Sequence, residues 1–137
     1  MGLAGRAAPR MSRPEDGLQK FTVDLLRQGA APGVIWFHCP NGAPTSARTG
    51  ARMKAMGLLA GVADMIVVRP GGLVYFLELK SAKGRLSPAQ KAFRDACEDN
   101  GVPYAVADSP ERVEAALRGW SVLRLKWSEL VAIKKAA

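Results

Sequence analysis

Histidine and cysteine are scarce in this chain of 137 residues, which contains one histidine and two cysteines. A zinc site built on several histidines is excluded, and a serine triad would have to use the single imidazole of His38. Cys39 and Cys97 are too few for a framework of disulfide bonds. The sequence therefore predicts a protein with free thiols and without histidine-based metal chemistry.

Long apolar runs are also missing. The most apolar segment, residues 57–68, is interrupted by Asp64, so it is too short and too polar to span a membrane. Residues 1–11 are rich in Gly, Ala and Pro and lack the apolar stretch of a secretory signal, so we expect a disordered tail there. Together these absences predict a cytoplasmic protein with no membrane partner.

Acidic residues are outnumbered: 12 Asp and Glu stand against 20 Lys and Arg, for a formal net charge of +8. Residues 1–60 hold eight basic and three acidic residues, whereas residues 61–100 hold six and five. A surplus of this size favours a polyanionic partner, of which nucleic acid is the commonest. The length and the 48% of apolar residues fit one globular domain.

Helix and strand signals alternate along the chain. Ser12 to Glu15 has the form of a capping box, and Ser87 precedes Pro88, as is typical of a helix start. Helices are predicted over 13–28, 51–57, 88–99 and 110–118, and strands over 34–37, 62–68, 73–79 and 103–107. Residues 122–135 fit either a strand followed by a helix or one irregular extension. The order αβ(α)ββαβα predicts an α/β fold with a mixed sheet flanked by helices.

Two carboxylates interrupt the predicted strands: Asp64 lies within 62–68 and Glu78 within 73–79. An isolated buried carboxylate is costly, so such groups are usually paired, hydrogen-bonded or bound to metal. Lys80 shares a strand face with Glu78 because side chains alternate along a strand. The three residues are therefore candidate site residues, with a structural salt-bridge cluster at a sheet edge as the alternative.

The loop at 70–72 decides whether the two acids meet. A three-residue loop pairs Arg69 with Leu73 and places Asp64 opposite Glu78, whereas a two-residue loop puts the acids on opposite faces. Directly opposed side chains have Cβ atoms about 4.5–5.5 Å apart, where like charges repel. A Mg²⁺ ion would reverse that repulsion and orient a water toward a phosphate. Lys80 could then stabilise the phosphate or position and deprotonate the water.

Asp64, thirteen further residues and then Glu78-Leu79-Lys80 resemble the signature of PD-(D/E)XK nucleases. More specific matches flank it: Pro40-Asn41-Gly42 after His38, Lys54-Ala55-Met56-Gly57, Gly61-Val62-Ala63-Asp64, Lys83-Gly84-Arg85-Leu86-Ser87-Pro88-Ala89-Gln90, and Gly101-Val102-Pro103-Tyr104. Together they resemble the VRR-NUC branch, the virus-type replication and repair nucleases, over residues 12–119. This family usually has Pro where the chain has Ala63. The resemblance implies a restriction-endonuclease-like core.

The resemblance also implies a metal site and its residues. Asp64, Glu78, Glu15 and the Leu79 carbonyl match the metal ligands, with Mg²⁺ as the cofactor and Mn²⁺ as its substitute. Lys80 matches the catalytic lysine, and Gln90 the glutamine of the helix that follows. Glu15 and Gln90 have a structural alternative, because each occupies the third position of a capping box.

The function implied by the resemblance is Mg²⁺-dependent DNA endonuclease activity on branched DNA, such as a Holliday junction or a flap. The setting would be phage or bacterial replication, recombination or repair, in the bacterial or phage-infected cell, with the chain acting as a homodimer. Residues 120–137, with Trp120 and Trp127, are a candidate dimer element.

Phosphate contacts are expected from Lys83 and Arg85, which follow the catalytic strand, and from Asn41, Arg48, Arg52 and Lys54, for which a solvated basic loop is the alternative. His38 is interpreted as a strand-end or DNA-facing residue. No module for reading base sequence is recognisable, so selection by DNA shape is expected. Two rival interpretations are a non-catalytic, basic nucleic-acid-binding module on the same fold and a structural α/β protein with an acidic partner.

Overall fold

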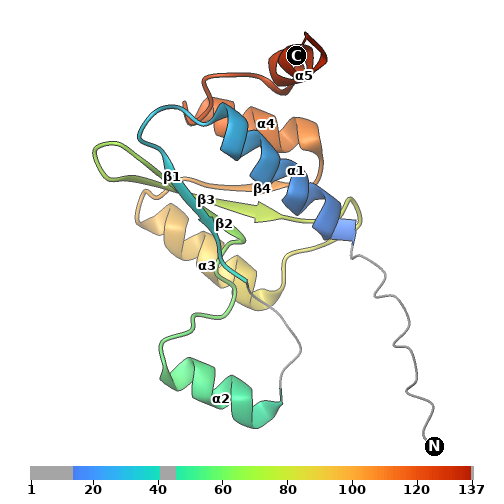
Figure 1. The fold of residues 1–137 in the computed structure, drawn as a ribbon. Helices are drawn as coiled ribbons and strands as arrows, with labels where there is room; N and C mark the ends of the chain where they lie inside the picture. The colour runs from blue at the N-terminus through green and yellow to red at the C-terminus, as the bar shows by residue number, and fades with distance from the viewer. Residues whose placement is uncertain (1–13, 41–45, 137) are drawn as a thin grey trace, which may run out of the picture.

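Four strands form one mixed sheet at the centre of the molecule (Figure 1). The structure, a computed structural model, describes residues 14–40 and 46–136. Neighbouring strands pair in the order β1-β2-β3-β4, antiparallel except for the parallel pair of β3 and β4. The strands are β1 (Ile35–His38), β2 (Met65–Arg69), β3 (Leu73–Leu79) and β4 (Tyr104–Ala107). The α/β class and the mixed sheet predicted from the sequence are confirmed.

Helices cover both faces of this sheet (Figure 1). They are α1 (Pro14–Gly29), α2 (Ala47–Ala55), α3 (Pro88–Asp99), α4 (Pro110–Gly119) and α5 (Trp127–Ala136). The first α4 turn follows the N-cap Ser109, whose side chain accepts from the Arg112 amide. Helices α1 and α4 pack together on one face, α5 packs against α1, and α3 lies on the opposite face. The tail expected at residues 1–11 lies outside the described residues.

The main core lies between the sheet and the α1 and α4 layer. Alternate residues of the strands point into it, so Met65, Val67 and Leu77 are fully buried against Leu25 of α1 and Leu117 of α4. Burying one side chain of this size stabilises the fold by about 1.5–3 kcal/mol. Because side chains alternate along a strand, the residues between these core positions point toward the opposite layer.

The opposite layer is built around aromatic rings. Phe93 of α3 packs edge-on against Phe76 of β3, with centroids 5.0 Å apart, and at 6.0 Å from the ring of Tyr104 on β4. Glu78 lies on the same face of β3 as Phe76, two residues further along. Helix α3 is therefore anchored directly over the strand that carries the predicted site.

The hairpin between β2 and β3 has the register that brings the two acids together. Arg69 pairs with Leu73 and Met65 with Leu77, so the loop contains three residues, as in the first of the two alternatives. Gly71 and Gly72 adopt φ values of 91° and 77°, which a residue with a Cβ rarely adopts. Continuing the same register by one residue sets Asp64 opposite Glu78.

Two predicted elements begin three or four residues away from the observed start, each because a side chain takes a hydrogen-bonding role. Helix α2 begins at Ala47 rather than at 51, since the hydroxyl of Ser46 accepts from the Thr49 amide and caps the helix. Strand β2 begins at Met65 rather than at 62, so Asp64 lies just before the strand. The carboxylate of Asp64 accepts from the Leu79 amide, in place of a main-chain carbonyl.

The segment after α4 packs onto the body of the chain. The Ala31 amide donates to the Val122 carbonyl at 2.7 Å, and Ala30 and Leu123 form an isolated bridge in place of a strand. Helix α5, absent from the predicted order, follows and buries Leu130. Its role in dimer formation stays a prediction. No helix in the described part of the chain is long and apolar enough to cross a bilayer.

The two tryptophans of this segment contact rings of the same chain. Trp120 lies 5.1 Å from Tyr75, and Trp127 meets Phe21 edge-on at 4.8 Å. Both rings are part of the layer that covers the core. The segment therefore packs onto the α/β core and is not a separate appendage.

Candidate active site

Asp64 is held by three hydrogen bonds from two strands. Its carbonyl oxygen accepts from the Cys39 amide at 2.8 Å and lies 2.8 Å from Nδ1 of His38 at the end of β1. Its Oδ2 accepts from the Leu79 amide at 2.8 Å. Ala63, the residue before it, is fully buried. The position of Asp64 is therefore set by hydrogen bonds on both sides of it.

Glu78 lies opposite Asp64 and is almost completely buried, with 2% of its surface exposed. Its Oε1 accepts from Nε2 of Gln90 at 3.0 Å and lies 3.8 Å from Nζ of Lys80. Its Oε2 is buried and receives no donor from the described residues. One oxygen of this carboxylate is thus oriented by the protein, and the other is left without a positive or donating partner.

The pKa of the Glu78 carboxyl is raised from 4.5 to about 8. Burial is the largest cause and the negative charge of Asp64 adds to it, while the ammonium of Lys80 acts in the opposite direction. Two carboxyl groups at one site, with one oxygen unpartnered, form a centre that a cation stabilises by supplying the missing positive charge.

Gln90 uses different atoms for its two roles. Its Oε1 accepts from the Ser87 amide at 2.8 Å and completes the capping box of α3, while its Nε2 donates to Glu78. The two interpretations given for Gln90, helix cap and site residue, are therefore compatible. Because the amide group carries an acceptor and a donor, it joins the start of α3 to the buried acid.

The main chain of Gly61 lies directly against the first turn of α3. A Cβ atom at Gly61 would overlap the carbonyl group of Ala89 and lie 2.7 Å from the amide nitrogen of Gln90. The residue also has φ +82°. Only glycine fits this contact without displacing the helix turn that carries Gln90.

The residues present fit a divalent cation with oxygen ligands. Asp64 and Glu78 supply two carboxylates, and one or two are what Mg²⁺ requires alongside its waters. The Leu79 amide faces Asp64, and the carbonyl of an extended residue lies on the same side as its amide, so the Leu79 carbonyl borders the same gap. Within residues 14–40 and 46–136 no three His, Cys, Asp or Glu side chains cluster. The buried, donor-free Oε2 of Glu78 is the observation that favours a cation.

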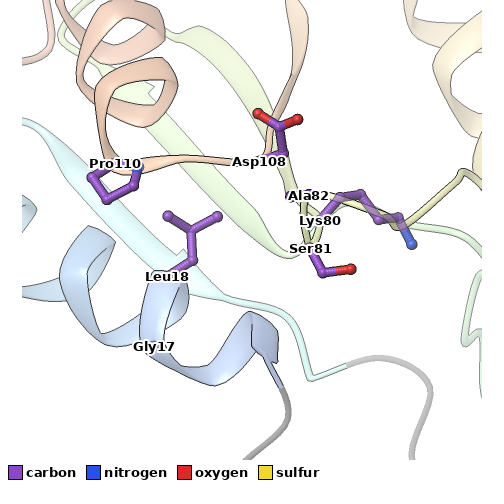
Figure 2. A pocket seen from close by; sticks show the side chains of 7 residues that line it. All are labelled: Gly17, Leu18, Lys80, Ser81, Ala82, Asp108 and Pro110. Atoms are coloured by element: carbon purple, nitrogen blue, oxygen red, sulfur yellow. The ribbon is translucent and has the colours of Figure 1, made fainter.

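Lys80 follows β3 at the edge of a cavity of about 240 Å³. Figure 2 shows Leu18 and Pro110 on one side of this cavity and the Lys80 ammonium directed away from them. Lys80 and Asp108 follow the parallel strands β3 and β4, so the cavity opens at the carboxyl ends of that pair. The ammonium is close to Glu78 and is 14% exposed, which suits an interaction with a bound anion.

The remaining predicted residues are distributed over several elements. Lys83 and Arg85 are exposed in the connection between β3 and α3. Arg48, Arg52 and Lys54 are exposed on α2, which has no buried residue and lies apart from the sheet (Figure 1). Glu15 is in the first turn of α1, but its side chain, like all of Asn41, lies outside the described residues.

Tyr104 is a neighbour of the site that the sequence did not single out. Its hydroxyl is buried and has no hydrogen-bond partner among the described residues. Burial and the charge of Glu78 raise the pKa of this phenol above its ordinary value. Tyr104 lies close to Glu78 because β4 pairs with β3 in parallel, and no local sequence pattern predicts this pairing.

Comparison with known proteins agrees with this arrangement. The family model for the VRR-NUC domain matches residues 11–111. A solved structure described as "VRR_NUC domain protein" has a TM-score of 0.64 and 20% identity, with 80% of this chain and 89% of that chain covered. Another, "VRR_NUC domain", has a TM-score of 0.58 and 17% identity, with 80% and 99% covered. No curated protein matches.

At these identities the two structures establish the fold, which is the expected restriction-endonuclease-like core. The family model spans most of the chain, from the start of α1 to the start of α4. The chain belongs to the VRR-NUC family of nucleases.

Proposed function

We propose that this protein is a Mg²⁺-dependent DNA endonuclease that hydrolyses phosphodiester bonds. The observation that carries the proposal is the buried Glu78 opposite Asp64, with one carboxylate oxygen held by Gln90 and the other without a donor. Lys80 lies 3.8 Å from the same carboxylate, where its charge can act on a phosphate. A metal ion held by the two acids and a phosphate would therefore both lie next to the Lys80 ammonium group.

Each residue has a separate task in the proposed reaction. Asp64 and Glu78 hold the cation, with the Leu79 carbonyl as a further ligand. Mg²⁺, when bound, neutralises phosphate charge and lowers the pKa of a water. The Lys80 ammonium stabilises the negative charge that develops on the scissile phosphate. Gln90 orients Glu78 so that Oε2 remains available to the metal.

The proposed substrate is branched DNA, such as a Holliday junction or a flap, in phage or bacterial replication, recombination or repair. Exposed basic residues follow the strand of the site at Lys83 and Arg85, and others lie on α2 at Arg48 and Arg52. Such residues bind phosphates in any sequence and position the backbone. The protein would then select its substrate by the shape of the DNA, because this shape determines whether the DNA backbone can contact the basic residues and the metal site at the same time.

A second copy of the chain is the proposed protein partner. Ile35 and Phe37 on the edge strand β1 are 63% and 46% exposed, and Met56 and Leu59, next to α2, are 81% and 59% exposed. Large apolar side chains gathered on a surface favour a protein interface. We propose β1 and the segment that follows α2, in addition to the predicted dimer element at residues 120–137, as the surfaces through which two copies meet. Light scattering of the protein and of a Met56→Ser, Leu59→Ser variant tests this.

The decisive experiment compares three DNA forms: a four-way junction, a flap and a plain duplex. Each is incubated with the protein in Mg²⁺ and in EDTA. We expect metal-dependent cutting of the branched forms and loss of cutting in Lys80→Ala, with DNA binding retained. Lys91→Ala, which removes an exposed lysine of α3, is the matched control and should cut normally.

Three results would contradict the proposal or a part of it. Binding without metal-dependent cutting would favour the non-catalytic nucleic-acid-binding module on the same fold. Cutting that survives Lys80→Ala would remove the proposed role of the lysine. Equal cutting of duplex and branched DNA would leave the nuclease activity but remove selection by shape.

A further inference from the structure

His38, the last residue of β1, lies against the main chain of Asp64, the acid that directly precedes β2. Its Nδ1 is 2.8 Å from the Asp64 carbonyl oxygen, which also accepts from the Cys39 amide at 2.8 Å. A carbonyl oxygen can only accept, so Nδ1 carries the proton and donates it. The two acceptor sites of this carbonyl are therefore both used by β1.

Asp64 needs this support because it lies outside the regular strand. Strand β2 begins at Met65, and residues 58–63 before it belong to no helix or strand. The side chain of Asp64 is held from the other side by the Leu79 amide of β3. Strand β1 thus fixes the main chain from which the carboxylate extends, and β3 fixes the carboxylate itself.

We propose that His38 is a positioning residue for the metal site. Its Nδ1–H group, acting with the Cys39 amide, holds the Asp64 main chain so that the carboxylate stays opposite Glu78. This inference rests on the proposed function, because it assigns His38 to the metal that Asp64 and Glu78 would hold. Outer residues that orient metal ligands typically change metal affinity or activity by about 10–100-fold when they are replaced.

Two amide substitutions separate the ring atoms of His38. Asparagine places a donor nitrogen where Nδ1 stands, whereas glutamine places it near the position of Nε2. His38→Asn therefore keeps the bond to the Asp64 carbonyl, and His38→Gln and His38→Ala lose it. All three variants remove the imidazole ring, which is exposed, so a general effect of ring loss would affect them alike.

The first measurement is Mn²⁺ binding to the full chain without DNA, by titration calorimetry at fixed pH. We expect His38→Ala and His38→Gln to weaken the Mn²⁺ Kd by about tenfold, and His38→Asn to stay close to the unchanged protein. The second measurement is junction cutting, in which kcat should fall for the same two variants while the KM for DNA stays unchanged. The third is amide exchange of Leu79 in the metal-free protein, which should accelerate several-fold in those variants.

The outcomes separate this inference from the proposed function. If the unchanged protein binds Mn²⁺ and cuts DNA while His38→Ala does both equally well, the positioning role is wrong and the nuclease proposal stands. If His38→Asn is as impaired as His38→Ala, or if only the KM for DNA rises, His38 acts through Nε2 or on the DNA. If the unchanged protein neither binds Mn²⁺ nor cuts, both proposals fall together.

Discussion

Gln90 donates from Nε2 to Oε1 of Glu78 at 3.0 Å, which connects the first turn of α3 to the buried acid of β3. The same side chain accepts from the Ser87 amide through Oε1. A structural change at the start of α3 can therefore alter the position of Glu78 through the Gln90 side chain. This connection allows the helix cap and the candidate catalytic role to be tested separately.

Substitutions at Gln90 should separate stability from activity. Gln90→Glu keeps an oxygen for the cap but replaces the donor to Glu78 with a carboxylate oxygen, so we expect the cap to remain, stability to fall only through repulsion between the acids, and cutting to be strongly reduced. Gln90→Ala loses both contacts and should also cost about 1 kcal/mol of unfolding free energy, as lost caps do. Urea unfolding and junction cutting measure the two effects.

Ser87→Ala provides the matched control for Gln90. The hydroxyl of Ser87 accepts from the Gln90 amide and belongs to the cap, but it makes no bond to Glu78. We expect a loss of about 1 kcal/mol in stability with cutting largely retained. Equal loss of cutting in Ser87→Ala and Gln90→Glu would show that the bond to Glu78 has no role of its own.

The metal-free protein should lose stability as the pH rises from about 5 to 8. The pKa of Glu78 is near 8 in the folded chain and near 4.5 when unperturbed, so the folded state binds more protons in this window. The free energy of unfolding then falls with pH, by at most about 1.4 kcal/mol per unit. Unfolding in EDTA at several pH values measures the slope, and Glu78→Gln should remove this part of it. An unchanged slope in Glu78→Gln would contradict the raised pKa.

Gly61→Ala should be more damaging than Gly57→Ala, although both glycines have positive φ. The new Cβ at Gly61 would overlap the Ala89 carbonyl, whereas at Gly57 no atom lies within 4 Å. We expect about 1–2 kcal/mol for the left-handed conformation at Gly57. Gly61→Ala should lose a further 1–3 kcal/mol, roughly the cost of overpacking, together with cutting activity. Thermal unfolding and junction cutting of both variants compare these costs.

Divalent cations should stabilise the fold through the two acids. A ligand that binds only the folded state at 100 times its Kd raises the unfolding free energy by about 2.7 kcal/mol. We therefore expect Mn²⁺ or Mg²⁺ to raise the Tm, and Asp64→Asn to abolish that rise. Asp24→Asn, an exposed position on α1, is the control and should respond like the unchanged protein. A rise of equal size in both variants would point to a cation site elsewhere.

Much of the site was predictable because it depends on strand alternation. Glu78 and Lys80 share a face of β3, and the three-residue loop fixes the register that sets Asp64 opposite Glu78. The shared face follows from local geometry, whereas the register was one of two alternatives that the sequence left open and that the structure decided. The fold class followed equally from the alternation of helix and strand signals, whose caps and turns are short-range features.

Other features could not be predicted because they need contacts between distant segments. Strand β2 begins later than predicted because the Asp64 carboxylate accepts a hydrogen bond from the Leu79 amide, fifteen residues away in the sequence. Helix α5 could not be distinguished from an irregular extension, because its place depends on Phe21 and on the bridge between Ala30 and Leu123.

By itself, the sequence determined most of the elements, the excess of basic residues, and the two acids whose burial between apolar strand residues would be costly without a partner. Only the tertiary structure decided that Glu78 has one oxygen held by Gln90 and one without a donor, and that His38 supports the main chain of Asp64. The physical reason is that the hydrogen bonds, the burial and the raised pKa of these side chains arise only when residues from separate strands and helices come into contact. The sequence pattern identifies these residues, whereas the distances between their side chains in the folded protein determine which ligand they can bind.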